Sequence, residues 1–171
     1  MTIASAPTPH RRHLATALFL AVAMAAVVGT ALGFQHIGGY IPCKLCYEQR
    51  TPYYVGVPIM VLAAISAALR WPLWVTRGLL LIGGLLMTYS LYLGVKHAGV
   101  EWAWWAGPTD CGAVDSVDTG GKGVLDALNT FVPPSCDKAA LRVLGLSFAG
   151  WNAVASLFLA VVAYRGAATR S

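Results

Sequence analysis

Four long stretches without a charged residue constrain the fold of this chain more than any other feature. They cover residues 14–34, 52–69, 78–95 and 143–164. About 20 helical residues are needed to cross the roughly 30 Å hydrocarbon core of a bilayer. Because lipid offers no partner to backbone N–H and C=O groups, each stretch must be helical. The sequence therefore predicts an all-α integral membrane four-helix bundle, built as a single membrane domain over residues 1–171.

Composition excludes the main alternatives to a membrane protein. Hydrophobic residues make up 57% of the chain and charged residues 11%, against about 25% charged residues in soluble domains. The net charge of +5 comes from scattered basic residues, and no nucleic-acid-binding motif is present, so we expect no nucleic acid partner. Stretch 14–34 is too long for the apolar region of a cleaved signal peptide, and we interpret it as a span.

The distribution of charge predicts the orientation of the spans. All seven acidic residues fall in 35–51 or 96–142, whereas the two terminal segments and the second loop carry arginines and no acid. The positive-inside rule therefore predicts cytoplasmic termini and two outer loops, 35–51 and 96–142. In the longer loop, the apolar spacing over 124–132 predicts a short surface helix. We interpret three tryptophans of this loop as an interfacial belt rather than as ligand-stacking residues: Trp102, Trp104 and Trp105.

Each predicted outer loop holds two cysteines. The pairs are Cys43 with Cys46, and Cys111 with Cys136. On an oxidising side of the membrane such residues rarely remain free thiols. A bridge between Cys43 and Cys46 would constrain the unfolded chain little, so we expect that pair to serve thiol–disulfide exchange. Lys44 and the nearby start of a helix at about residue 52 both favour a thiolate.

Cysteines can also bind a metal ion or form a purely structural disulfide. Structural zinc sites show close pairs of ligands, and Cys111 and Cys136 are far apart in the sequence, so we predict no metal site. A purely structural disulfide between Cys111 and Cys136 stays open.

Two segments around the cysteines carry a family resemblance. Phe34-Gln35-His36, followed by Pro-Cys-Lys-Leu-Cys-Tyr-Glu-Gln-Arg over 42–50, resembles the bacterial disulfide bond formation protein B family, DsbB. Gly-Pro-Thr-Asp-Cys over 107–111 and Ser-Cys-Asp over 135–137 are similar to the second cysteine loop of that family. Gln49 stands where some members have Glu, and we expect little consequence because Arg50 is retained.

The resemblance implies an inner-membrane bundle that holds a quinone, either ubiquinone or menaquinone, and draws on the membrane quinone pool. It implies that Cys111 is attacked by a reduced periplasmic thioredoxin-like dithiol oxidase, a DsbA-like partner. Cys136 is then released and attacks Cys43, and Cys46 becomes a thiolate that faces the quinone. Reduction of the quinone restores the Cys43–Cys46 disulfide. We expect a resting enzyme with one disulfide in each outer loop.

Arg50 and two histidines are the remaining candidate residues. From spacing alone, Arg50 is either an interfacial anchor or a fixed cation that stabilises the Cys46 thiolate and polarises a quinone carbonyl. His36 and His97 are interpreted as interfacial hydrogen-bonding residues rather than catalysts. We place Arg50, Cys46 and His97 among the residues expected to contact the cofactor.

The prediction is thus a quinone-dependent, disulfide-forming thiol oxidase of the bacterial inner membrane, with its active cysteines on the periplasmic side. One alternative is a thiol oxidoreductase similar to vitamin K epoxide reductase, although the Cys-x-x-Cys of that family comes after the loop cysteines. The other is a non-enzymatic scaffold whose disulfides only connect its loops. That alternative predicts that Cys46→Ser leaves function intact.

Overall fold

Four long helices dominate the computed structural model, which describes residues 8–109, 111 and 135–169. All four are long and apolar enough to cross a membrane, which confirms the predicted all-α membrane bundle. Their bounds are Pro9–His36 for α1, Lys44–Ala68 for α2, Leu73–Glu101 for α3 and Phe148–Ala168 for α5.

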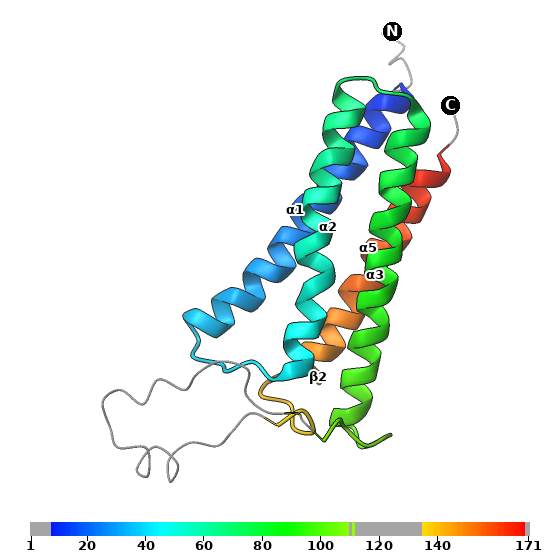
Figure 1. Ribbon diagram of the computed structural model, residues 1–171. Helices are drawn as coiled ribbons and strands as arrows, with labels where there is room; N and C mark the ends of the chain where they lie inside the picture. The colour runs from blue at the N-terminus through cyan, green and yellow to red at the C-terminus, as the bar shows by residue number, and fades with distance from the viewer. Residues whose placement is uncertain (1–7, 110, 112–134, 170–171) are drawn as a thin grey trace, which may run out of the picture.

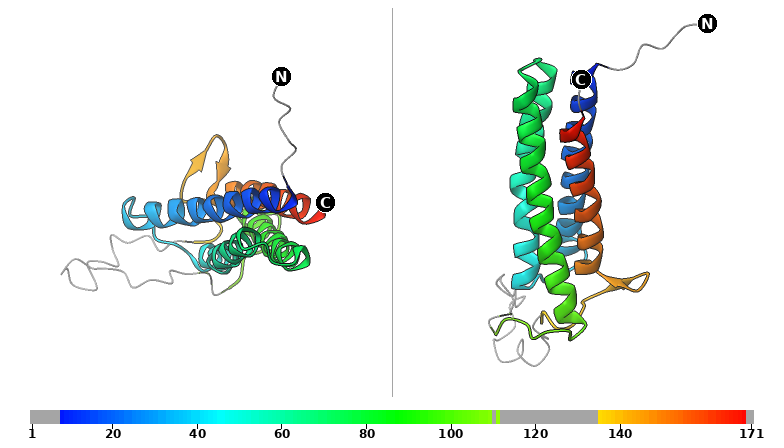
Figure 2. Two further views of the ribbon diagram at one scale, coloured as in Figure 1. Left: turned by 90° about the horizontal axis from the view of Figure 1, so that it is seen from above. Right: turned by 90° about the vertical axis from the view of Figure 1, so that its right-hand side faces the viewer.

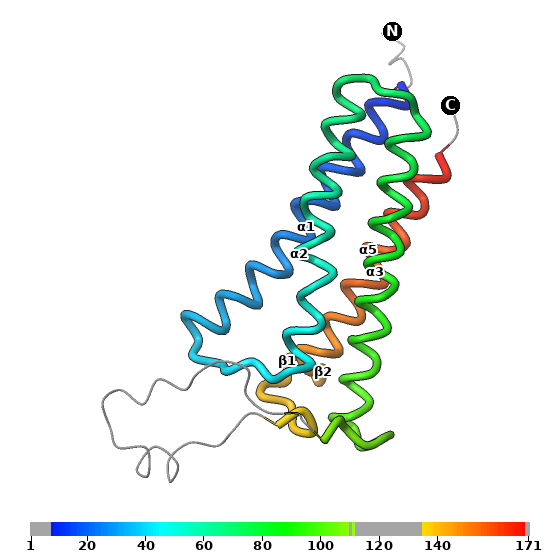
Figure 3. Tube along the Cα trace, viewed as in Figure 1, coloured from blue at the N-terminus to red at the C-terminus, as the bar shows by residue number. Residues whose placement is uncertain are grey.

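The helices form one closed, elongated bundle (Figures 1 and 2). Helix α2 packs against both α1 and α3, α3 packs along α5, and α5 also contacts α1. The start of α1, the end of α5 and the α2–α3 connection all lie at one end of the bundle (Figure 3). The other end carries the α1–α2 connection and the segments around the second cysteine pair. Which end faces the cytoplasm stays a prediction.

Close helix contacts in the bundle depend on small residues. A Cβ atom added to Gly83 would lie 2.5 Å from Cε of Met60, and one added to Gly56 would lie 2.9 Å from Sδ of Met24. Both methionines are fully buried. In a membrane, where helices gain little from hydrophobic burial against each other, such tight packing supplies much of their association.

Helix α2 begins earlier than the sequence indicated. It starts at Lys44 rather than near residue 52, with Cys43 as its N-cap residue, so Pro52 and Pro58 both lie inside it. The prediction that Pro52 occupies the first turn was therefore wrong. Proline has no N–H, so each removes one backbone hydrogen bond from the helix. Surrounding helices make such prolines tolerable in a membrane.

The last helix begins later than predicted, at Phe148 rather than at residue 143. Before it, Arg142–Val143 (β1) and Leu146–Ser147 (β2) pair as a short antiparallel hairpin. Its turn residues, Leu144 and Gly145, have φ angles of 51° and 83°. Positive φ at both positions is typical of the type I′ turn, whose twist matches that of paired strands.

Ser147 explains where α5 starts. Its side-chain oxygen accepts a hydrogen bond from the backbone N–H of Gly150 at 3.2 Å, which makes Ser147 the N-cap. The other ends differ too, since α1 and α3 extend beyond the predicted spans. The surface helix predicted over 124–132 lies outside the described residues.

Candidate redox site

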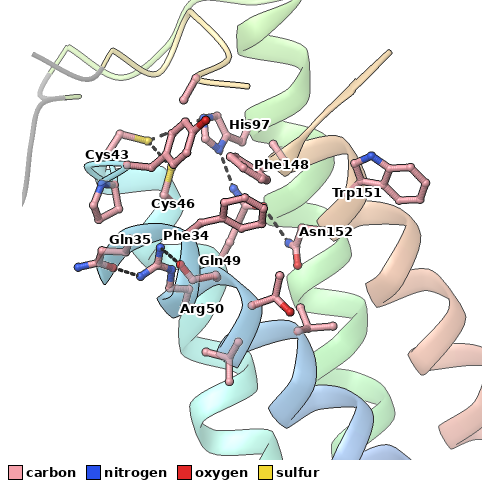
Figure 4. A pocket seen from close by; sticks show the side chains of 18 of the residues that line it. Phe34, Gln35, Cys43, Cys46, Gln49, Arg50, His97, Phe148, Trp151 and Asn152 are labelled. Atoms are coloured by element: carbon pink, nitrogen blue, oxygen red, sulfur yellow. Dashed lines mark hydrogen bonds between the residues drawn. The ribbon is translucent and has the colours of Figure 1, made fainter. Parts of the chain in front are cut away.

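A cavity of about 350 Å³ lies at the cysteine-bearing end of the bundle, walled by α1, α2, α3 and α5 (Figure 4). Three aromatic rings form part of its wall. The ring centroids of Phe34 and Phe148 are 4.9 Å apart, and Tyr40 lies 5.9 Å from each of them. Polar side chains also line it, but most of the cavity surface is apolar. The cavity therefore suits a flat, largely apolar ligand.

Cys43 and Cys46 both line this cavity. Their Sγ atoms lie 2.8 Å apart and are not joined as a disulfide, so the structure differs here from the bridge that we expected for this pair. Because Cys43 is the N-cap of α2 and Cys46 lies in the first turn, both sulfur atoms lie at the positive end of the helix dipole. This placement favours a thiolate in the reduced pair.

The environment of Cys43 favours its thiolate strongly. A hydrogen bond from the Cys46 thiol is the largest influence, and it lowers the pKa of Cys43 to about 4. His97 lowers this pKa further, while burial of the sulfur opposes both effects. These contacts therefore favour a thiolate at Cys43 in the reduced pair.

The second cysteine pair lies against the first. Cys111 and Cys136 form a disulfide, with Cα atoms 5.9 Å apart. Cys136 belongs to a buried cluster with Cys43, Leu45 and Val100, and Cys46 and Cys111 pack on that cluster. The Sγ atoms of Cys43 and Cys136 lie within 4.8 Å of each other. The structure thus brings together all four cysteines singled out from the sequence.

His97 is buried beside the cysteines rather than placed at an interface, with 4% of its surface exposed. The side-chain amide of Gln49 donates through Nε2 to His97 Nδ1 at 2.6 Å and to the carbonyl of Leu45 at 3.3 Å. Its Oε1 accepts from Asn152 at 2.8 Å, so the amide orientation is determined on both sides. His97 Nδ1 is therefore an acceptor, and Nε2 carries the hydrogen that faces Cys43 Sγ at 3.9 Å.

This tautomer bears on metal binding. The ligand atoms of Cys43, His97 and Cys136 lie close enough together to hold an ion. A histidine binds a metal through a nitrogen that has no hydrogen. Because Nε2 of His97 carries the hydrogen, the arrangement favours donation to a Cys43 thiolate over metal ligation.

The hydrogen bonds continue from Gln49 into the bundle core. The Tyr53 hydroxyl donates to Asn152 at 2.8 Å and lies 2.8 Å from the hydroxyl of Ser156, which in turn donates to Ser90 at 2.8 Å. Sequence reasoning missed this network. Its signal was the presence of polar residues within apolar spans, where each needs a partner.

Arg50 lies in the cavity wall on α2. Its guanidinium donates to Gln35 Oε1 and, at 3.5 Å, to the carbonyl of Ala31, so it connects α2 to α1 (Figure 4). It also lies 5.2 Å from the ring centroid of Tyr47, a cation–π contact. Of the two interpretations of Arg50, the structure favours a fixed cation in the cavity near Cys46 over a lipid-facing anchor.

The tryptophans that follow α3 contact one another rather than the cavity. Trp104 packs edge-on against both Trp102 and Trp105. Trp105 donates from Nε1 to the carbonyl of Lys96 at 2.9 Å. Among the described residues, the tryptophan that lines the cavity is Trp151 of α5, which the sequence did not single out.

Comparison with known proteins gives a consistent result. A family model described as disulfide bond formation protein DsbB matches residues 11–165, which include all four cysteines. A disulfide bond formation protein B from a Polaromonas species is 29% identical over 164 residues, covering 89% of this chain and 87% of that protein. A protein of the same name from Ralstonia nicotianae is 41% identical over 87 residues, which are 47% of this chain and 54% of its own. No solved structure matches the chain.

Proposed function

This chain belongs to the family of disulfide bond formation protein DsbB, and we propose that it is a membrane thiol oxidase that transfers electrons from a soluble dithiol protein to a quinone. Family membership makes it a disulfide-forming membrane oxidoreductase. The observation that carries the finer proposal is the position of Cys43, which lies in the cavity wall and within 4.8 Å of Cys136.

The cavity has the features that a quinone site needs. Its volume of about 350 Å³ falls within the roughly 300–1,000 Å³ of small-molecule sites. Phe34, Tyr40 and Phe148 offer ring faces to a flat head group, and Arg50 offers a hydrogen-bond donor for a carbonyl. A bound quinone supplies an acceptor for two electrons and two protons. Ubiquinone and menaquinone both fit this description.

The electrons pass through two disulfide exchanges. A thiolate of the soluble partner attacks Cys111, which breaks the Cys111–Cys136 bond and releases Cys136 as a thiolate. With Cys43 and Cys46 joined as a disulfide, Cys136 attacks Cys43 across the buried cluster and Cys46 leaves as a thiolate. Arg50 and the start of α2 stabilise that leaving charge. The second thiol of the partner then attacks the partner sulfur bound to Cys111, which oxidises the partner and frees Cys111 as a thiolate. Cys111 attacks Cys136, which re-forms the Cys111–Cys136 disulfide and releases Cys43, so that Cys43 and Cys46 are left reduced.

The partner and the location follow from the same proposal. The partner is a periplasmic thioredoxin-like dithiol oxidase, DsbA-like, because the DsbA–DsbB–quinone system keeps the bacterial periplasm oxidising. The chain acts as one inner-membrane domain with both termini in the cytoplasm and the cysteines on the periplasmic side. The arginines of the termini and of the second loop, and the absence of acids there, support this orientation.

Quinone reduction by the purified protein tests the proposal. We would mix the detergent-solubilised protein with a reduced thioredoxin-like oxidant and a water-soluble ubiquinone analogue, and follow the quinone absorbance. Repeated turnover is expected from the wild type and none from Cys46→Ser. Cys43→Ser is the matched second variant, since it removes the sulfur that receives electrons from Cys136. Equal activity of wild type and Cys46→Ser would favour the scaffold alternative, in which the disulfides only connect loops.

A further inference from the structure

A second ionisable group shares the corner of the cavity that holds His97. Glu101 is the last residue of α3 and lies one helical turn after His97. Its side chain is 5% exposed and lines the cavity, with Oε1 3.8 Å from Nε2 of His97. Within the described part of the chain, its Oε2 is buried without a hydrogen-bond partner. A buried carboxyl group with an unsatisfied oxygen is costly, so its presence calls for a functional reason.

The proposed reaction needs a proton that the cysteines do not supply. Forming the Cys43–Cys46 bond releases two electrons, and the quinone takes up two electrons and two protons. In the exchange proposed above, Cys46 leaves as a thiolate, and the start of α2 also favours a thiolate at Cys43, so the reduced pair does not bring both protons. The protons of the partner's thiols are released at the outer surface. At least one proton per turnover must therefore enter the cavity from water.

His97 is poorly suited to import that proton. A histidine relay accepts a proton on one ring nitrogen and releases one from the other. Nδ1 of His97 is occupied by the donating amide of Gln49, whose orientation is determined by Leu45 and Asn152. Protonation of Nδ1 would require that whole set of hydrogen bonds to reverse. His97 therefore acts as a donor toward Cys43 and not as a relay.

We propose that Glu101 carries protons between the outer surface and the cavity during quinone reduction. The inference rests on the proposed function and adds a proton-transferring residue to it. Glu101 ends α3 at the cysteine-bearing end of the bundle, and the next residues, Trp102 to Trp105, are exposed. Its Oε2 is free to hold a proton. A shift of about 1 Å would bring Oε1 into hydrogen-bond distance of His97 Nε2, so Glu101 stays oriented while it gives up its proton.

Other ionisable groups line the same cavity and are part of any pH dependence. Those on α2 and its N-cap are Cys43, Cys46, Arg50 and Tyr53. The remaining ones are Tyr40 from the α1–α2 connection, His97 from α3 and Lys138 from the segment before α5. Among the described lining residues, Glu101 is the single carboxyl group.

A single-turnover experiment separates proton delivery from thiol exchange. The protein is reduced chemically, freed of reductant, and mixed without oxygen with a ubiquinone analogue, while quinol formation is followed across a range of pH. Glu101→Gln keeps the size of the side chain but holds no exchangeable carboxyl proton, and Glu101→Asp keeps the carboxyl group. Glu48→Gln is the matched control, because it removes a carboxyl group from the same end of the bundle but outside the cavity lining.

We expect Glu101→Gln to slow quinol formation by about 100-fold or more at neutral pH, since general acid–base groups contribute about 10²–10⁴. The loss should grow as pH rises, while Glu101→Asp recovers part of the rate and Glu48→Gln matches the wild type. Reduction of the Cys111–Cys136 disulfide by the partner should be unchanged in Glu101→Gln, which also shows that the variant is folded.

The two proposals fail in different ways. Absence of quinol formation by the wild type would overturn the quinone oxidase proposal itself. A wild type that works, together with a Glu101→Gln protein within about twofold of it at every pH, would overturn the role of Glu101 alone. A Glu101→Gln protein that is slow by the same factor at all pH values and is not improved by Glu101→Asp would also overturn it, because that pattern indicates a structural defect.

Discussion

Replacing Gln49 with methionine tests whether the buried amide network controls the redox cysteines. Gln49 is 7% exposed and connects three helices, through Leu45 on its own helix, His97 on α3 and Asn152 on α5. Methionine has a similar length and fills the same space, but it can neither donate to His97 nor accept from Asn152. The substitution therefore removes hydrogen bonds without creating a cavity.

The expected cost follows from the groups that lose a partner. His97 Nδ1 would lose its 2.6 Å donor, and Asn152 would keep a weaker contact, 3.4 Å to Ser90. An unsatisfied buried polar group costs about 1–3 kcal/mol in soluble proteins, and an interhelical hydrogen bond in a membrane protein contributes about 0.6 kcal/mol on average. We expect the free energy of unfolding to fall by about 1–3 kcal/mol, too little to unfold a bundle of ordinary stability.

The effect on the site should be larger than the effect on the fold. Without the amide, the imidazole of His97 can rotate or change tautomer, and Nε2–H no longer points at Cys43. Loss of about 1.4 kcal/mol of support for the thiolate corresponds to a tenfold lower rate. Quinone turnover would be measured in detergent, next to thermal unfolding of the same samples.

Gln49→Glu provides the matched control for this test. A carboxylate still accepts from Asn152, and it pairs with a protonated His97 whose Nε2–H still faces Cys43, so turnover should stay close to the wild-type rate. A methionine variant with unchanged stability and turnover would refute the reasoning. So would a glutamate variant as impaired as the methionine one.

Three further outcomes are expected. Arg50→Met should raise the KM for quinone by about 10- to 100-fold, because it removes a charge-assisted hydrogen bond of about 1.5–3 kcal/mol. Thiol exchange with the partner should stay normal. An unchanged KM would mean that Arg50 only connects α2 to α1. Because the pKa of Cys43 is lowered to about 4, the rate of its alkylation in the reduced protein should not change from about pH 5 to 8. An ordinary thiol of pKa about 8.5 reacts about tenfold faster for each unit of pH over this range. Cys46→Ala lacks the thiol that donates to Cys43 and should restore this dependence on pH. Tyr53→Phe should cost about 1–2 kcal/mol of unfolding free energy, since it leaves the carbonyl of half-buried Asn152 without its donor. Unaltered thermal unfolding would argue against the network.

The sequence predicted the bundle because its strongest signals are local. A long stretch without charge predicts a membrane span regardless of what the rest of the chain does. The positions of the cysteines along the chain likewise identified both pairs. Helix ends were less predictable. Pro52 indicated a first turn, but contacts from neighbouring helices allow α2 to begin at Lys44. At the start of α5, a hairpin precedes the N-cap residue Ser147. The hairpin and the cap both lie within the uncharged stretch 143–164, so the absence of charge alone did not predict them.

Contacts between distant residues were out of reach of sequence reasoning. His97 resembled an interfacial residue because its position near the end of a span is all that the sequence shows. Its Nδ1 accepts from Gln49, which in turn accepts from Asn152, and these two residues come from two other helices. Glu101 counted as one of several acids in an outer loop, since nothing local indicates that α3 continues to that residue and turns its side chain into the cavity.

The two prolines inside α2 have a consequence for how the molecule moves. The carbonyls of Glu48 and Tyr54 have no N–H four residues later, because positions 52 and 58 are prolines. The turns that carry Cys43 through Arg50 are thus joined to the rest of α2 by a weakened hydrogen-bond ladder. In native-state hydrogen exchange, amides of this segment should open at lower free energy than those after residue 58. Such a unit can rearrange each time a disulfide forms or breaks while the remainder of the bundle stays closed in the membrane.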